Sequence, residues 1–306
     1  MKLPVAEPIE REPIEREPIE REPIELKPYG ASQVRWPVAL DEVLGVLDVQ
    51  PATAAWPGGS AAVLANLPSS HGGILGAQLV GQQVVLAERL HPGKRVQSLQ
   101  TLFLRSGTWQ EPLEAHVEQL AQGRSFASVS LTFRQGRELI CKAQVLLTVD
   151  EPDPARTAVT AVPGPDPQDA TPVEMPLLPW DTRLAAGGTW QAHDLWMRRK
   201  DVPDDPTLWR ALVAYTCEPT TLPLLMADHG TVGGPDSVGR PHTALIVALT
   251  VTFFEDLDVR DWHVVRTEVP YAGGARVHGR GQVLDSGGRP SALFTTVGLF
   301  RPAAGD

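Results

Sequence analysis

The longest notable hydrophobic segment is the run of residues 72–87, which contains no charged residue. We expect the rest of the chain to be arranged around it. Apolar residues recur on almost every side of this run at helical spacing, which predicts a helix that is buried nearly all round. The run is shorter than the ~18 apolar residues needed to cross a bilayer. It also contains three glutamines, so we exclude a membrane span. A buried helix of this kind requires other elements packed around it.

Two further segments have helical spacing, and strand patterns surround them. This spacing predicts two additional helices, at residues 38–49 and 206–217, the second with a proline in its first turn. Runs that alternate between apolar and polar residues, or are continuously apolar, predict strands. The predicted strands are 96–104, 113–120, 126–134 and 139–149 in the first half, and 194–199, 244–254, 262–269, 275–285 and 291–301 in the second.

The order of helix followed by strands therefore occurs twice, which indicates a duplicated α+β architecture. Residues 135–137 and 286–289 have the composition of hairpin turns, so the strands are expected to be antiparallel. In each module the sheet is expected to curl around its central helix.

Proline-rich segments divide the chain into four parts. Residues 1–30 contain a five-residue repeat, EPIER, whose regular prolines are incompatible with a helix and predict a disordered arm. A second proline-rich segment, residues 151–180, is expected to be a linker. The two modules are then residues 31–150 and 181–303.

Composition narrows the possible functions. The 306 residues are 42% hydrophobic and carry a net charge of −10, which argues against a nucleic-acid partner. No signal peptide is recognisable, so we expect a cytoplasmic protein. The two cysteines, Cys141 and Cys217, lie far apart in unrelated contexts and are expected to be buried thiols. No sequence motif indicates a metal or a cofactor, and none is expected.

The start of the buried helix has features of a binding site. Ser69 or Ser70 is positioned to cap it, and the free N–H groups of a first helical turn attract a carbonyl oxygen that is becoming an oxyanion. His71 next to Gly72 and Gly73 either contacts the substrate or bonds the helix start.

Further along the same helix, small residues suggest a gap. Gly76, Ala77 and Gly81 remove side-chain bulk, so another backbone or a ligand can approach closely. Gln78 and Gln82 lie four residues apart and are expected to present their amides beside this gap.

Several short stretches, taken in order, resemble acyl-CoA thioesterase II, a family of double hot-dog thioesterases. The resemblance covers residues 40–301 and is carried by stretches 76–82, 103–107, 123–127, 196–198, 202–205 and 222–223. It implies two fused hot-dog modules, with an acyl-CoA or related acyl thioester bound at the seam between them. It also implies a homo-oligomer, by analogy with other hot-dog proteins.

The same resemblance assigns candidate catalytic residues. Family members hydrolyse the thioester with a water held by an Asp, a Ser or Thr, and a Gln, which map onto Glu218, Ile246 and Thr296. Glu218 keeps the carboxylate and is the candidate base, although Pro219 is expected to push it away from helical geometry. Ile246 has no hydrogen-bonding group. Strand alternation predicts Thr250 on the same face as Ile246, so Thr250 and Thr296 are the candidate helpers.

We therefore expect an enzyme that hydrolyses an acyl thioester with activated water. The expected substrate-binding residues are His71, Gly72, Gly73, Gln78, Gly81, Gln82 and Arg105. Two alternatives stay open: a divergent hot-dog enzyme that dehydrates or cyclises an acyl or polyketide-like substrate, and a non-catalytic protein that binds acyl thioesters.

Overall fold

A computed structural model describes most of the chain beyond its N-terminal segment. The described residues are 38–51, 61–69, 72–155, 157–161, 166–175, 177–188, 192–222 and 242–302, with only the backbone described at 242, 243 and 302. The repeat arm therefore lies outside the described residues, and so do Ser70 and His71.

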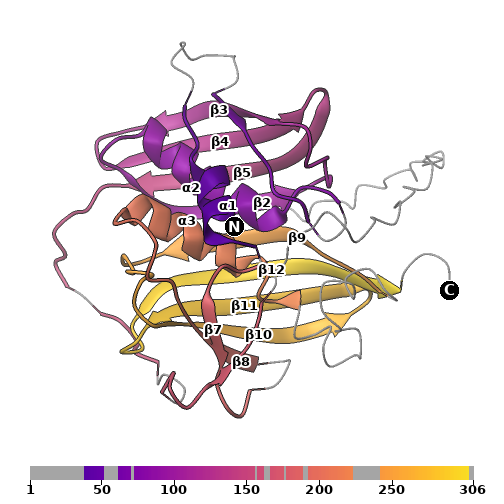
Figure 1. Cartoon of the computed structure of the whole chain (residues 1–306). Helices are drawn as coiled ribbons and strands as arrows, with labels where there is room; N and C mark the ends of the chain where they lie inside the picture. Colours follow the sequence, from indigo (N-terminus) through magenta and orange to yellow (C-terminus); the bar gives the residue numbers. More distant parts are fainter. Residues whose placement is uncertain are drawn as a thin grey trace, which may run out of the picture.

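One antiparallel sheet of 12 strands runs through both modules (Figure 1). Its order is β1-β3-β4-β5-β2-β9-β12-β11-β10-β8-β7-β6. The first module contributes β1 (Ala62–Leu64), β2 (Arg95–Phe103), β3 (Leu113–Gln122), β4 (Phe126–Gln135) and β5 (Glu138–Thr148). The second contributes β6 (Thr171–Pro172), β7 (Asp181–Leu184), β8 (Ala192–Arg198), β9 (His242–Phe253), β10 (His263–Gly273), β11 (Arg276–Asp285) and β12 (Pro290–Pro302).

The two modules join in the middle of this sheet. Strands β2 and β9 pair directly, with Gln100 opposite Thr250, so the sheet is continuous across the module boundary. On either side of this pair, β5 and β12 occupy equivalent places, followed by β4 and β11. The arrangement is that of two hot-dog modules, as the sequence predicted.

The helices that the described residues form lie on the inner face of the sheet: α1 (Leu40–Leu47), α2 (Gly76–Leu90) and α3 (Pro206–Cys217). Helix α3 begins with Pro206, and the side chain of Asp205 accepts a hydrogen bond from the N–H of Thr207 at 2.8 Å. These two residues satisfy the usual requirements of a helix start. Helix α2 begins at Gly76 with Leu75 as its N-cap and no side-chain capping bond, so Ser69 is not the predicted cap, and Ser70 lies outside the described residues.

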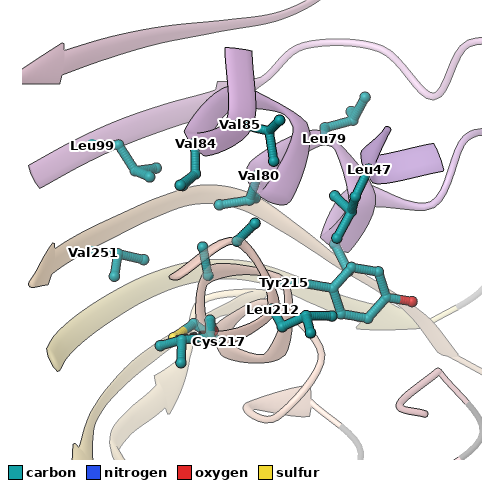
Figure 2. Close-up of a cluster of buried hydrophobic side chains, with 14 of the residues drawn as sticks. Leu47, Leu79, Val80, Val84, Val85, Leu99, Leu212, Tyr215, Cys217 and Val251 are labelled. Atoms are coloured by element: carbon teal, nitrogen blue, oxygen red, sulfur yellow. Dashed lines mark hydrogen bonds between the residues drawn. The ribbon is translucent and has the colours of Figure 1, made fainter. Parts of the chain in front are cut away.

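Helices α2 and α3 pack side by side at the centre of the molecule (Figure 1). Figure 2 shows Val80 and Val84 of α2 directed toward α3, with Leu99 of β2 and Val251 of β9 beside them. All four side chains are buried and belong to one core that extends through both modules. The predicted buried helix therefore exists, and the other module's helix is one of the elements packed around it.

Gly81 sets how closely the two helices approach. A Cβ at this position would lie 2.7 Å from Cδ2 of Leu47 in α1 and 3.1 Å from the backbone oxygen of Ala211 in α3. Protein atoms of α1 and α3 thus fill the gap that the sequence predicted beside Gly81.

The remaining predicted elements match the structure closely. All the predicted strands are present, and Gly136 takes a φ of +53° in the turn between β4 and β5. Both cysteines are buried and free. The segment predicted as a linker is in part structured: residues 171–172 form β6, and Leu178 and Trp180 are buried against the core. No helix within the described residues is long and apolar enough to span a membrane.

Replacing Gly81 with valine should destabilise the protein by about 1–3 kcal/mol, because the new side chain forces α2 away from α3 and α1. Chemical unfolding monitored by circular dichroism measures the change. Gly45→Ala is the matched control: nothing lies within 4 Å of a Cβ at this position in α1, so alanine should be neutral or slightly stabilising. Equal stability of Gly81→Val and the parent would contradict this account of the helix crossing.

Candidate functional site

The carboxylate of Glu218 lies at the N-terminus of helix α2. Glu218 directly follows the last residue of α3, and a Cβ at Gly76, the first residue of α2, would lie only 2.8 Å from Oε1 of Glu218. The two helices run in opposite directions, so the end of one meets the start of the other. Glycine at position 76 leaves the space that the carboxylate occupies.

Pro219 does not displace Glu218 from helical geometry. The backbone of Glu218 has φ −70° and ψ −54°, which continues α3, so the predicted distortion is wrong. The bias against helical geometry before proline is modest. Here it is outweighed by packing, because residues 219–222 are all buried.

Burial raises the pKa of Glu218 to about 7. Among the described residues, no hydrogen bond or ion pair to this carboxylate offsets the loss of water. A carboxyl group with a pKa near 7 takes up and releases a proton around neutral pH, as a general acid or base must. The first-turn N–H groups of α2 have no side-chain cap, so the site combines a titratable carboxylate with partly positive backbone donors.

An apolar wall adjoins this carboxylate. Phe103, at the end of β2, would contact a Cβ at Gly76 at 3.6 Å through its Cε1 atom. The same phenylalanine packs against a second hydrophobic cluster that includes Leu222 and Ile246. Ile246, which replaces the hydroxyl residue of the family, is therefore part of an apolar surface near the candidate base.

Thr296 lies behind the turn that follows α3. Its Oγ1 atom is 3.0 Å from Oγ1 of Thr221, and both residues are buried. Gly279 on the neighbouring strand makes this contact possible, since a Cβ there would meet both threonines at 2.4–2.8 Å. The described residues show no hydrogen bond between Thr296 and Glu218. The threonine pair instead anchors the turn that carries Glu218 to the sheet.

Thr250 lies on the opposite face of the sheet from the helices. Strand β9 has a bulge at Val247: Ile246 pairs with Gly298 and Ala248 pairs with Val297, leaving Val247 unmatched. The extra residue reverses the alternation of side chains. Leu249 and Val251 therefore face the core, and the prediction that Thr250 shares a face with Ile246 is wrong.

The side chains of Gln78 and Gln82 form hydrogen bonds within the protein and do not line a gap. The side chain of Gln78 accepts a hydrogen bond from the N–H of Leu67 and donates to Oδ1 of Asn66 at 2.8 Å. That of Gln82 donates to the backbone oxygens of Val46 at 3.0 Å and Ala65 at 2.9 Å. The two buried amides hold residues 65–67 and α1 against α2, so the predicted binding role is not supported by their positions.

The other predicted binding residues lie around the start of α2 or on the surface. Gly72 and Gly73 belong to a turn, and Gly73 lies against Ser106, which a Cβ would meet at 2.8 Å. Arg105 is exposed and forms an ion pair with Glu138 at 2.7 Å. The described ranges contain no group of three or more His, Cys, Asp or Glu side chains arranged to hold a metal ion.

Two family models match the chain. Residues 66–149 match the acyl-CoA thioesterase N-terminal domain, and residues 152–300 match the acyl-CoA thioesterase C-terminal domain. The chain belongs to the acyl-CoA thioesterase family. The boundary between the two matches coincides with the end of β5. No curated protein matches the chain.

Solved structures of similar fold include thioesterase II proteins. The tesB protein of Mycobacterium avium subspecies paratuberculosis has 24% identity and a TM-score of 0.72, covering 86% of this chain and 100% of that one. Acyl-CoA thioesterase II TesB2 of Mycobacterium marinum has 23% identity and a TM-score of 0.68 over the same shares. A conserved hot-dog protein of Alicyclobacillus acidocaldarius has 16% identity and a TM-score of 0.63, covering 85% and 97%. These likenesses establish the double hot-dog fold.

The sequence did not indicate the roles of three residues of this candidate site. Gly76 and Phe103 lie in stretches that carry the family resemblance, but the contact of Gly76 with Glu218 was not predicted. Thr221 was not singled out. The Gly76–Glu218 contact joins residues far apart in the chain, and the signal available was the run of small residues at the start of α2.

Glu218 should make stability depend on pH. Its pKa is raised on folding, so its contribution is fully present below the pKa of the unfolded chain and is lost as pH rises through about 7. Urea titrations from about pH 5 to pH 8 give the free energy of unfolding of the parent and of Glu218→Gln. From pH 5 to about 7 this free energy should fall more steeply in the parent, and above pH 7 both proteins should show the same dependence on pH. Identical pH dependence in both proteins would contradict the raised pKa.

Proposed function

We propose that the protein hydrolyses acyl-CoA thioesters with a water molecule activated by Glu218. The observation that carries this proposal is the position of the Glu218 carboxylate, with its pKa of about 7, against the uncapped start of α2. Membership in the acyl-CoA thioesterase family supports the substrate class.

In this proposal Glu218 acts as the general base. Its ionised carboxylate accepts a proton from water as the water oxygen attacks the carbonyl carbon of the thioester. The carbon–sulfur bond then breaks, and the CoA thiolate leaves and takes up a proton. The products are a carboxylic acid and CoA, and the reaction involves no oxidation or reduction.

The first-turn N–H groups of α2 are suited to hold the carbonyl oxygen. A helix N-terminus favours negative charge, and negative charge develops on this oxygen during attack. Gly76 has no side chain and so leaves room for the Glu218 carboxylate directly beside these N–H groups. The apolar wall of Phe103, Leu222 and Ile246 is suited to the acyl chain.

Thr221 and Thr296 act as positioning residues in this proposal. Their hydrogen bond ties the turn after α3 to strand β12, which fixes where the Glu218 carboxylate lies. Thr250 has no part in it, because its side chain lies on the outer face of the sheet.

Glu218→Gln should lower kcat for thiol release from acyl-CoA by about 10²–10⁴-fold, because the amide cannot accept the proton. A thiol-reactive chromophore measures CoA release over a panel of acyl chain lengths. Thr250→Val is the matched control and should keep the parent rate. Parent-like turnover by Glu218→Gln, or no release by the parent with any chain length, would refute the proposal.

The pH profile gives a second test. Since the base must be ionised, kcat/KM should rise with pH and level off above an apparent pKa of about 7. Rates measured from about pH 5 to pH 9 in buffers of constant ionic strength show whether this limb exists. A profile that is flat through pH 7 would mean that Glu218 is not the base.

A further inference from the structure

Helices α2 and α3 are related residue by residue across the seam. Counted from the first residue of each helix, Gly81 and Ala211 are both sixth, and these two residues form the helix crossing. By the same count, Glu88 and Glu218 are both thirteenth. The candidate base therefore has an equivalent carboxylate in the first module, at the opposite end of the seam.

The strands show the same correspondence. Strand β2 has a bulge at Gln97, where Val96 and Ser98 pair with consecutive residues of β5. Strand β9 has its bulge at Val247, between Ile246 and Ala248. Both bulges lie three residues before the central Gln100–Thr250 pair as each strand is followed along the chain. Val96 and Ile246 are thus equivalent, and each lies on the module whose helix carries the corresponding glutamate.

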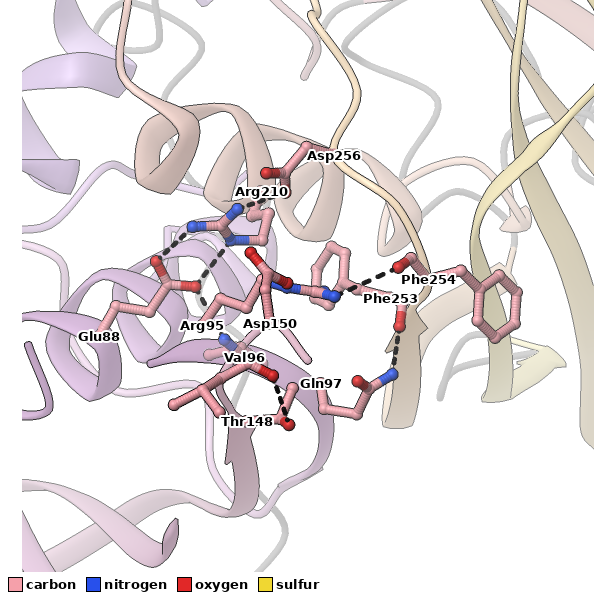
Figure 3. A network of polar contacts seen from close by, with 11 residues as sticks. Glu88, Arg95, Val96, Gln97, Thr148, Asp150, Arg210, Phe253, Phe254 and Asp256 are labelled. Carbon is pink, nitrogen blue, oxygen red and sulfur yellow. Dashed lines mark hydrogen bonds and ion pairs between the residues drawn. The ribbon is translucent and has the colours of Figure 1, made fainter. Parts of the chain in front are cut away.

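The two glutamates differ in what surrounds them. Both carboxylate oxygens of Glu88 are occupied: Oε1 accepts from the N–H of Val96 at 2.9 Å and from Nε of Arg210 at 2.8 Å. Oε2 accepts from Nη2 of Arg210 and from the hydroxyl of Thr207, both at 2.7 Å. Figure 3 shows the Arg210 guanidinium lying between Glu88 and Asp256, which also pairs with it. No such partner is seen for Glu218 within the described residues.

A single helical position accounts for much of this difference. Arg210 is the fifth residue of α3, and the fifth residue of α2 is Val80. Burial lowers the pKa of Arg210, but hydrogen bonds and charges from Glu88 and Asp256 outweigh it, so its pKa is raised and it stays ionised. The aliphatic Val80 gives Glu218 no counter-charge.

We infer that Glu88 and Glu218 mark two equivalent sites, and that the guanidinium of Arg210 fills the first, so the chain has one substrate site and one ion-pair clamp. The substrate half of this inference rests on the proposed function, whereas the clamp does not. The bidentate ion pair leaves Glu88 no free oxygen for water. It also joins α2, α3 and the segment after β9, which come from both modules.

The first experiment counts substrate sites. Isothermal titration of the full chain with a non-hydrolysable thioether analogue of an acyl-CoA should give one equivalent per chain. Gly76→Val fills the space before Glu218 and should abolish binding altogether. Two equivalents in the parent, or one equivalent remaining in Gly76→Val, would overturn the inference. No binding to the parent would instead overturn the proposed function and, with it, the substrate half.

The second experiment tests the clamp without any substrate. Arg210→Met should lower the Tm by about 6 °C or more, because it leaves the Glu88 carboxylate buried and unpaired. Adding Glu88→Met should recover part of this loss, since two apolar side chains then replace the pair. Arg280→Met removes an exposed ion pair with Glu268 and should change the Tm by about 2 °C or less. The clamp would be overturned if the Tm loss of the double variant equalled the sum of the losses measured for Arg210→Met and Glu88→Met separately.

Discussion

The close contact between α2 and α3 determines the rest of the structure. Gly81 lets the backbone of Ala211 approach α2, and the pair of helices then forms a single core shared by both modules. Neither sheet half can cover its own helix completely, because the other helix lies on one side of it. The antiparallel direction of the two helices brings the end of α3 to the start of α2, and this places Glu218 beside Gly76.

Much of the fold follows from local sequence patterns, and much of the site does not. Helix α3 and the strands agree with periodicity to within a few residues, because side-chain alternation and turn residues are local properties. Thr250 was misplaced by a bulge that adds one unpaired residue and carries no composition signal in β9. Gln78 was assigned to a gap because its partners at residues 65–67 are fixed only by tertiary packing.

Glu218 is a carboxylate without a hydrogen-bond or ion-pair partner among the described residues, and burial raises its pKa. Other buried polar side chains, such as Gln83 and Arg210, have hydrogen-bond partners from facing elements. Burying a carboxylate without such partners favours its neutral form and costs stability when the group ionises. Buried ionisable groups with shifted pKa values occur mainly at functional sites. Glu218 is such a group, whereas the carboxylate of Glu88 is paired with Arg210.

Both modules belong to one polypeptide, and the direct pairing of β2 with β9 joins them in one sheet. In a symmetric dimer of identical subunits, every amino-acid replacement appears twice, once on each side of the axis. Fusion removes that restriction. Each half of this chain is free to diverge separately, so one half can retain chemistry while the other comes to serve cohesion.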